Sequence, residues 1–365
     1  MSLDRYDPLR AVAAREGLDA VALVPGANFR RLFNKDFHQN ERALVVIVPV
    51  KGMPAAVVPN LELASFALIN FEGEVFDWRD EVGPGAAFAA LAKHMPLKRL
   101  GVEGQRMRVM EHHALKHVLP DLEIVDAHRA ISALRLHKTD NEIALLKRAI
   151  AISESALEMT FADVRAGLTE TQVESILVQN LFRCGAEELA FDTIVAAGDN
   201  SARPHAKARA DYSIKAGDAL MFDFGARVGG LCADITRTVF VEHCPDEARA
   251  LYDTVKDANA VGRALAAPGV SAHDIDDAVI GHLERSPYAT LIRSKTGHGL
   301  GRDVHEDPYI MRGNHTLLEP GMVFTVEPGL YKAGAYGVRI EDDVLVTDEG
   351  ACSLTAFTRD LTVVK

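Results

Sequence analysis

The sequence predicts an α+β protein of two domains, an N-terminal α/β domain at residues 1–132 and a second domain with antiparallel strands at residues 133–365. Three observations predict this fold class. The 365 residues exceed what one hydrophobic core usually holds, so two domains are expected. Strand-like and helix-like apolar patterns alternate in the first part of the chain. A capping box at Thr139 and Glu142 then begins a long amphipathic helix, which sets the boundary near residue 132.

The elements of the first domain follow from short apolar runs that alternate with helical periodicity. The expected strands are Ala20–Val24, Ala43–Val48, Ala55–Val58, Glu74–Phe76, Arg99–Val102 and Glu123–Val125. The expected helices are Leu61–Ile69, Ala86–His94 and Met107–Leu119.

The second domain begins with the helix after Thr139, and a further helix is expected to begin at Thr169. Two more helices are expected at Pro245–Ala267 and Ser271–Leu283, before the last strands of the chain. Helices that cover a curved antiparallel sheet are typical of an α+β domain.

Asp223 and Asp234 are predicted to share one face of a hairpin. Both lie in apolar runs of strand character, and Val228–Gly230 between them is typical of a hairpin turn. A turn centred there places Asp223 directly opposite Asp234, with Cβ atoms about 4.5–5.5 Å apart. The two carboxylates could then bind one metal ion or bridge two.

Glu327 and Glu341 repeat this arrangement. A turn centred on Gly334 places Glu327 opposite Glu341, although Pro328 weakens the register because proline cannot donate to a ladder. Arg339 is two residues from Glu341 and therefore lies on the same face.

Four carboxylates drawn together without a cation would repel one another and hold protons. Two divalent ions would balance four negative charges and could lower the pKa of a bridging water. With His298 as a single imidazole beside the four acids, the donor set favours Mn²⁺, and Co²⁺ and Zn²⁺ remain alternatives. The pattern predicts a two-metal hydrolase.

Several blocks of the second domain follow one another in a fixed order, and these are Phe191–His205, Asp223–Gly225 followed by Asp234, Gly297–Glu306, Thr325–Gly329 and Val338–Asp342. Together they resemble the Xaa-Pro peptidase branch (prolidase and aminopeptidase P) of the pita-bread metallopeptidases. The resemblance covers roughly residues 137–365, and linked blocks are more specific than any single motif. The resemblance implies a creatinase-like N-terminal domain followed by a pita-bread catalytic domain.

The resemblance also implies a role for each metal ligand. Asp223 would bind one metal ion, Asp234 and Glu341 would bridge both, and His298 and Glu327 would complete the two sites. Glu327 would also handle the proton of a metal-bridging hydroxide that attacks the scissile carbonyl.

Substrate contacts are implied for His205 and His305, which would help to stabilise the tetrahedral intermediate, and Arg339 would orient the carboxylates. Arg42 follows a segment that is similar to bacterial Xaa-Pro dipeptidases and could pair with the free carboxylate of a dipeptide. The alternative is that Arg42 is a surface residue beside Glu41. One departure is Ser294, where relatives often carry histidine.

The expected activity is hydrolysis of Xaa-Pro dipeptides. Removal of the first residue from longer Xaa-Pro peptides, as aminopeptidase P does, is the main alternative, and a non-catalytic peptide-binding protein is a weaker one. Methionine aminopeptidases share the ligand pattern but generally lack the first domain and the block around His305. A homodimer is expected by analogy with relatives.

Composition fits a globular enzyme, with 48% hydrophobic and 25% charged residues. The net charge of −12 disfavours nucleic acids and anionic membranes as partners. The N-terminus lacks the pattern of a signal peptide, and the four cysteines show no paired spacing, so a cytoplasmic protein without disulfides is expected.

Overall fold

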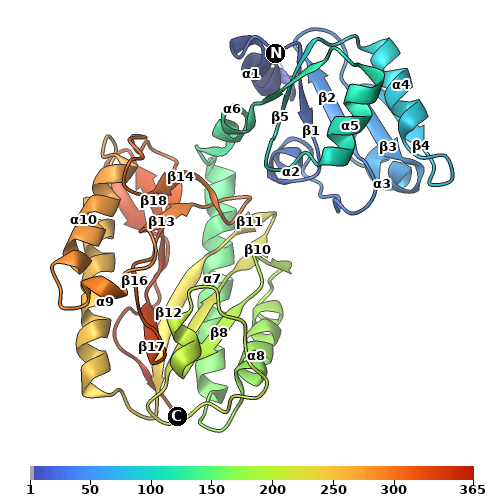
Figure 1. The fold of residues 1–365 in the computed structure, drawn as a ribbon. Coiled ribbons are helices and arrows are strands. Elements are labelled where there is room, and N and C mark those ends of the chain that lie inside the picture. The colour runs from blue at the N-terminus through green and yellow to red at the C-terminus, as the bar shows by residue number, and fades with distance from the viewer. Residues whose placement is uncertain (1–3) are drawn as a thin grey trace. The chain divides into compact units, whose positions relative to one another are not determined.

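The computed structural model describes residues 4–365 and divides into two compact units, Met1–Arg135 and Leu136–Lys365, called here the N-terminal and C-terminal units (Figure 1). No helix within the described range combines the length and apolar character that a membrane span needs.

The N-terminal unit is built on a six-stranded mixed sheet in the order β4-β3-β2-β1-β5-β6. Its strands are β1 (Ala20–Leu23), β2 (Val45–Pro49), β3 (Ala55–Pro59), β4 (Glu74–Trp78), β5 (Arg99–Val102) and β6 (Glu123–Asp126). Its helices are α1 (Asp7–Arg15), α2 (Ala27–Phe33), α3 (Leu63–Ala67), α4 (Gly85–His94), α5 (Val109–Val118) and α6 (His128–Ser132).

Both faces of the sheet are buried at β1, β2 and β3, because alternate residues of these strands enter two different hydrophobic clusters. Val21 and Val46 pack with Phe29 on one face, whereas Ala22 and Val45 pack with other residues on the opposite face. The predicted α/β organisation is therefore observed. Helices α1, α2 and α6 were not predicted, and the expected helix Leu61–Ile69 is a 3₁₀ turn at Asn60–Glu62 followed by the short α3.

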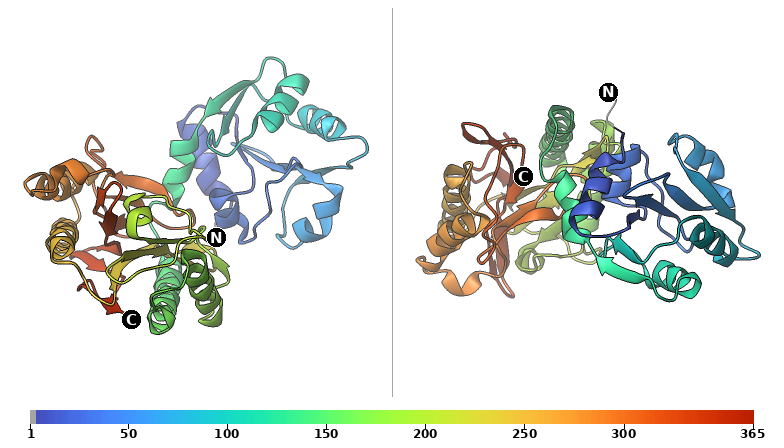
Figure 2. Two further views of the ribbon diagram at one scale, coloured as in Figure 1. Left: turned by 60° about the horizontal axis from the view of Figure 1, so that its bottom comes forward. Right: turned by 90° about the horizontal axis from the view of Figure 1, so that it is seen from above.

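The C-terminal unit contains four long helices, and three of them begin with capping boxes at Thr139, Thr169 and Ser271. The helices are α7 (Asp140–Asp163), α8 (Glu170–Arg183), α9 (Asp246–Leu265) and α10 (Ala272–Glu284). One hydrophobic cluster joins α7 and α8 to strands near the start of the unit, and another joins α9 and α10 to strands near its end. Figure 2 shows this separation of the two helix pairs from two further sides.

The strands of this unit form short sheets in the orders β11-β10-β7, β20-β12-β9-β8, β14-β13-β15-β18-β19 and β16-β17. The first group of strands is β7 (Glu188–Leu189), β8 (Ile194–Ala197), β9 (Ala219–Phe224), β10 (Ala226–Val228), β11 (Leu231–Cys232) and β12 (Ile235–Val241). The second group is β13 (Gly297–Gly299), β14 (Glu306–Ile310), β15 (Val323–Val326), β16 (Gly329–Lys332), β17 (Tyr336–Arg339), β18 (Asp342–Thr347), β19 (Gly350–Ser353) and β20 (Val363–Val364).

Candidate metal centre and active site

Asp223 and Asp234 lie on one hairpin, but the predicted register was wrong. Asp223 on β9 pairs with Thr236 on β12, not with Asp234. The turn consists of Gly229 and Gly230, both with positive φ (55° and 78°), as a tight two-residue hairpin loop requires. Compared with the predicted register, this turn displaces the partner of Asp223 by two residues, from Asp234 to Thr236. Because the displacement is even, Asp234 remains on the same face as Asp223, in the diagonal position.

The predicted register of Glu327 and Glu341 is confirmed. Val326 pairs with Asp342, and Gly329 pairs with Arg339, so the two glutamates between these pairs face each other. Their backbone N–H groups donate to neighbouring segments, from Glu327 to the carbonyl of Thr296 at 2.7 Å and from Glu341 to that of Thr236 at 3.1 Å. The bond to Thr236 joins the second hairpin to the strand that follows Asp234.

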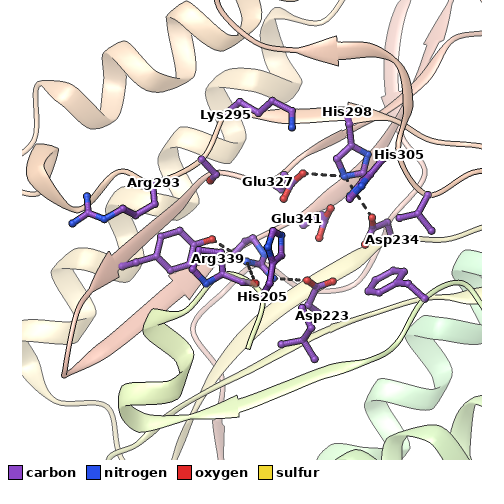
Figure 3. A pocket seen from close by; sticks show the side chains of 16 residues that line it. His205, Asp223, Asp234, Arg293, Lys295, His298, His305, Glu327, Arg339 and Glu341 are labelled. Carbon is purple, nitrogen blue, oxygen red and sulfur yellow. Dashed lines mark hydrogen bonds and ion pairs between the residues drawn. The ribbon is translucent and has the colours of Figure 1, made fainter. Parts of the chain in front are cut away.

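A cavity of about 730 Å³ contains every residue of the C-terminal unit that the sequence singled out, and Figure 3 shows their side chains around it. The cavity is also lined by residues that the sequence did not indicate as part of the site. These are Phe191, Ile194, Pro204, Arg293, Ser294, Lys295, Val304 and Tyr331. Proximity in sequence to the motif blocks is the only signal that could have found most of them.

The acidic side chains and His298 gather into groups that could each hold a metal ion. Within each group the potential ligand atoms lie within 4.8 Å of one another. The groups are Asp223 with Asp234 and Glu341, His298 with Glu327 and Glu341, and Asp234 with His298 and His305. Glu341 belongs to the first two groups and therefore lies between two possible metal positions.

His298 directs one ring nitrogen to the carboxylates. Its Nδ1 lies 3.1 Å from the carbonyl oxygen of Gly299, which favours a proton on Nδ1. Its Nε2 lies 3.1 Å from Oε1 of Glu327 and 3.7 Å from Oδ2 of Asp234. Nε2 therefore faces the carboxylate oxygens, and an imidazole nitrogen in that position can bind a metal ion when it carries no proton.

Charge in this cluster is not balanced by the protein alone. Burial, followed by the charges of neighbouring carboxylates, raises the pKa of Asp234 and of Glu341 well above their usual values. Burial also raises the pKa of Asp223, although Arg339 opposes that shift. Burial opposes ionisation of Glu327 too, but its hydrogen bond with His298 lowers its pKa. A cluster of buried oxygen donors that resists ionisation fits divalent metal ions, which would compensate its charge.

Arg339 connects the two hairpins. Its guanidinium donates to Oδ2 of Asp223, to the hydroxyl of Tyr331 at 2.9 Å and to Oγ1 of Thr236 at 3.0 Å. Burial opposes the charge on Arg339, but Tyr331 and Asp223 favour it, and its pKa is raised. The hydroxyl of Thr236 in turn donates to Oε2 of Glu341 at 2.6 Å.

Thr325 holds the other glutamate in a similar way. Its hydroxyl accepts a hydrogen bond from the backbone N–H of His298 at 3.1 Å and donates to Oε1 of Glu327 at 3.2 Å. Two buried threonine hydroxyls therefore orient the two glutamates, and neither threonine was predicted.

The two candidate substrate-side histidines line the cavity and are exposed, unlike the buried His298. The ring of His305 lies 4.1 Å from that of His298, centroid to centroid, in an edge-to-face arrangement. His205 follows Pro204, whose carbonyl accepts a hydrogen bond from Arg339 at 3.3 Å.

Arg42 belongs to the N-terminal unit, where acidic side chains bind it. Its guanidinium donates to Asp80 through Nε at 2.9 Å and Nη2 at 2.7 Å, and it also pairs with Glu41.

Residues 144–348, more than half of the chain, match the metallopeptidase family M24. The chain belongs to this family. Residues 5–137 match the creatinase/prolidase N-terminal domain. The predicted combination of a creatinase-like domain with a pita-bread catalytic domain, and the prediction of a metal-dependent peptidase, are confirmed.

Relatives match this M24 peptidase over nearly its whole length. An uncharacterized peptidase of Bacillus subtilis, YqhT, is 32% identical over 98% of this chain and 99% of its own. A prolidase structure from Thermococcus sibiricus covers 100% of both chains at 32% identity with a TM-score of 0.93. The structure of an X-Pro aminopeptidase from Thermotoga maritima covers 99% of this chain and 100% of its own at 28% identity, with a TM-score of 0.84.

Proposed function

We propose that this M24 peptidase hydrolyses the peptide bond before proline in Xaa-Pro dipeptides, with two divalent metal ions in the cavity. The observation that carries this proposal is that two groups of potential ligands share Glu341. One carboxylate between two groups of donors fits a bridging ligand for two ions. We assign Asp223 to one ion, Asp234 and Glu341 to both, and His298 and Glu327 to the completion of the two sites. Mn²⁺ is the proposed native ion, because most of the donors are carboxylate oxygens.

The bound ions would supply Lewis acidity and lower the pKa of the attacking water. Glu327 accepts the proton of that water and delivers it to the leaving nitrogen. This proton transfer is required because the proline nitrogen carries no hydrogen in the peptide and must gain one on release. Arg339 donates to Asp223 and opposes the rise in the pKa of Asp223 that burial causes.

His205 and His305 contact the peptide in this proposal and stabilise the negative charge that develops on the carbonyl oxygen. Their exposure within the cavity supports that role, since a substrate could reach both rings. The apolar side chains Phe191, Ile194 and Val304 in the cavity wall support recognition of the proline ring.

Dipeptides are the preferred substrate class in this proposal, and the full-length similarity to a prolidase supports them. Arg42 would then pair with the free carboxylate of the dipeptide. A homodimer is also proposed, on the basis of the resemblance to this family.

Hydrolysis of longer Xaa-Pro peptides, the activity of aminopeptidase P, is the second candidate. One observation favours it: Arg42 is already paired with Asp80 and Glu41, so binding a substrate carboxylate would require it to leave these partners. The similarity to an X-Pro aminopeptidase is also extensive.

The deciding experiment compares matched Xaa-Pro and Xaa-Pro-Yaa substrates with added Mn²⁺, beside a chelated control and a Met-Ala peptide. Chelator-sensitive cleavage mainly of the dipeptide supports the first proposal. Preference for the longer peptide supports the second candidate. Cleavage of the Met-Ala peptide alone contradicts both.

A further inference from the structure

Glu170, the first residue of α8, is fully buried and binds the segment that carries His205. Its carboxylate accepts hydrogen bonds from the backbone N–H of Ala197 at 2.8 Å and of Arg209 at 2.7 Å. It also accepts one from the side-chain amide of Asn200 at 2.9 Å. A single carboxylate thus binds both ends of segment 197–209 and one point within it.

Arg209, the last residue of this segment, also binds residues at the start of the segment. Its guanidinium donates to Glu170 at 2.9 and 3.1 Å, to the carbonyl of Ala197 at 3.0 Å and to Oδ1 of Asp199 at 2.9 Å. Charge-assisted bonds of this kind are stronger than neutral ones, and those to Glu170 are shielded from water.

The opposite side of the segment contacts strand β17 and Arg339. The hydroxyl of Ser201 accepts a hydrogen bond from the backbone N–H of Gly337 at 2.9 Å, and the carbonyl of Pro204 accepts one from Arg339. Figure 3 shows His205 beside Arg339 at the cavity. The segment therefore lies between the Glu170–Arg209 pair and the candidate catalytic residues.

We propose that Glu170, with Arg209, is a positioning residue that fixes His205 for contact with the substrate. The inference rests on the proposed role of His205 in Xaa-Pro hydrolysis. The backbone N–H groups of Ala197 and Arg209 bind different oxygens of Glu170. A glutamine at position 170 would present one acceptor oxygen and an NH₂ group, so its NH₂ would oppose one of these two donors. Segment 197–209 would lose a fixed position, and even a small displacement of a substrate-binding group such as His205 lowers the rate of turnover.

The test is a double-mutant cycle with E170Q, H205A and the double variant, measured as kcat/KM on an Xaa-Pro dipeptide in the Mn²⁺-loaded enzyme. E170Q is expected to lower kcat/KM roughly tenfold. In the H205A background the same substitution is expected to lower kcat/KM by less than about twofold, because the side chain that Glu170 positions is absent. Melting temperature and bound metal are measured for each variant, and the metal content is expected to match that of the wild type.

Glu174 supplies a matched control one helical turn further along α8. Its carboxylate accepts a hydrogen bond from Thr193, outside segment 197–209, so E174Q is expected to retain wild-type kcat/KM. If E170Q melts below the assay temperature, R209K replaces it in the cycle, because lysine keeps the charge but cannot make all the bonds of the guanidinium.

Equal losses from E170Q with and without His205 would overturn the positioning role and leave the proposed function intact. Wild-type kcat/KM in E170Q would do the same. If H205A itself were as active as the wild type, the proposed role of His205 would fail, and this inference with it.

Discussion

Asp234→Asn is expected to stabilise the metal-free protein at neutral to alkaline pH and to destabilise the metal-loaded one. In the folded chain the ligand oxygens of Asp234, Asp223 and Glu341 lie within 4.8 Å of one another. Without a cation this crowding opposes folding, whereas with metal bound the same oxygens would stabilise the fold. Asparagine preserves the size of the side chain and removes one charge.

The magnitude follows from this spacing. At an effective dielectric constant near 20, two unit charges separated by such a distance repel by about 3.5 kcal/mol. Protons held by the cluster already relieve part of this repulsion, so we expect a gain of about 2 kcal/mol at pH 8. For a unit of this size such a gain raises the melting temperature by about 4–8 °C.

The pH dependence has a definite sign. Burial and then the charges of Glu341 and Asp223 raise the folded-state pKa of Asp234 above its unfolded value. The proton on Asp234 therefore contributes stability that is fully present below the unfolded pKa of about 4 and is lost as the pH rises toward the folded pKa. The advantage of D234N in chelator should be small at pH 4 and largest at pH 8.

The assay is a set of melting curves between pH 4 and 8, in chelator and in excess Mn²⁺. In Mn²⁺ the order should reverse, because the wild type gains binding free energy that the variant loses. Asp342→Asn is the control. Asp342 is also fully buried but pairs with Arg237 at 2.8 Å and Arg359 at 2.7 Å, so its loss should destabilise the protein by about 3 kcal/mol with or without metal. If D234N and D342N destabilise the chelated protein equally at pH 8, the reasoning is refuted.

Three further predictions concern single substitutions. Glu327→Gln should lower kcat at least about a hundredfold through loss of the proton acceptor; near-normal turnover with full metal content would contradict this. Thr236→Val should weaken metal binding about 10- to 100-fold, measured by titration in metal buffers, because Glu341 and Arg339 each lose a buried hydrogen bond; unchanged affinity would argue against that orienting role. Arg42→Ala should lower kcat/KM about tenfold for a dipeptide and much less for the matching tripeptide, and equal losses would exclude a carboxylate clamp.

Turn geometry explains why one carboxylate pair was predicted in the correct register and the other was not. The turn around Gly334 has the symmetric centre that the sequence suggests, so Glu327 faces Glu341. In the other hairpin Gly229 and Gly230 alone form the turn, and the pairing moves by two residues. An even displacement preserves the face of every side chain, which is why Asp234 still reaches the cluster.

Helices with strong local signals were predicted well, whereas α2, which is short and largely buried, was missed. The capping boxes at Thr139 and Thr169 mark the observed starts of α7 and α8. Helix α2 has no side-chain cap, and even its polar residues Asn28 and Arg30 are buried, so it shows no amphipathic pattern. Periodicity predicts helices that present one face to water.

The orientation of the ligands depends on contacts that no local pattern encodes. Thr236 joins Glu341 to Arg339 across more than a hundred positions of the chain, and Thr325 joins Glu327 to the backbone of His298. In both cases a buried hydroxyl accepts one bond and donates another, so each glutamate is held by a residue that is not itself a potential ligand. The sequence could therefore predict which residues gather as potential metal ligands, through their chemistry and strand register. It could not predict the hydrogen bonds that fix their directions, because those bonds exist only after the strands have come together.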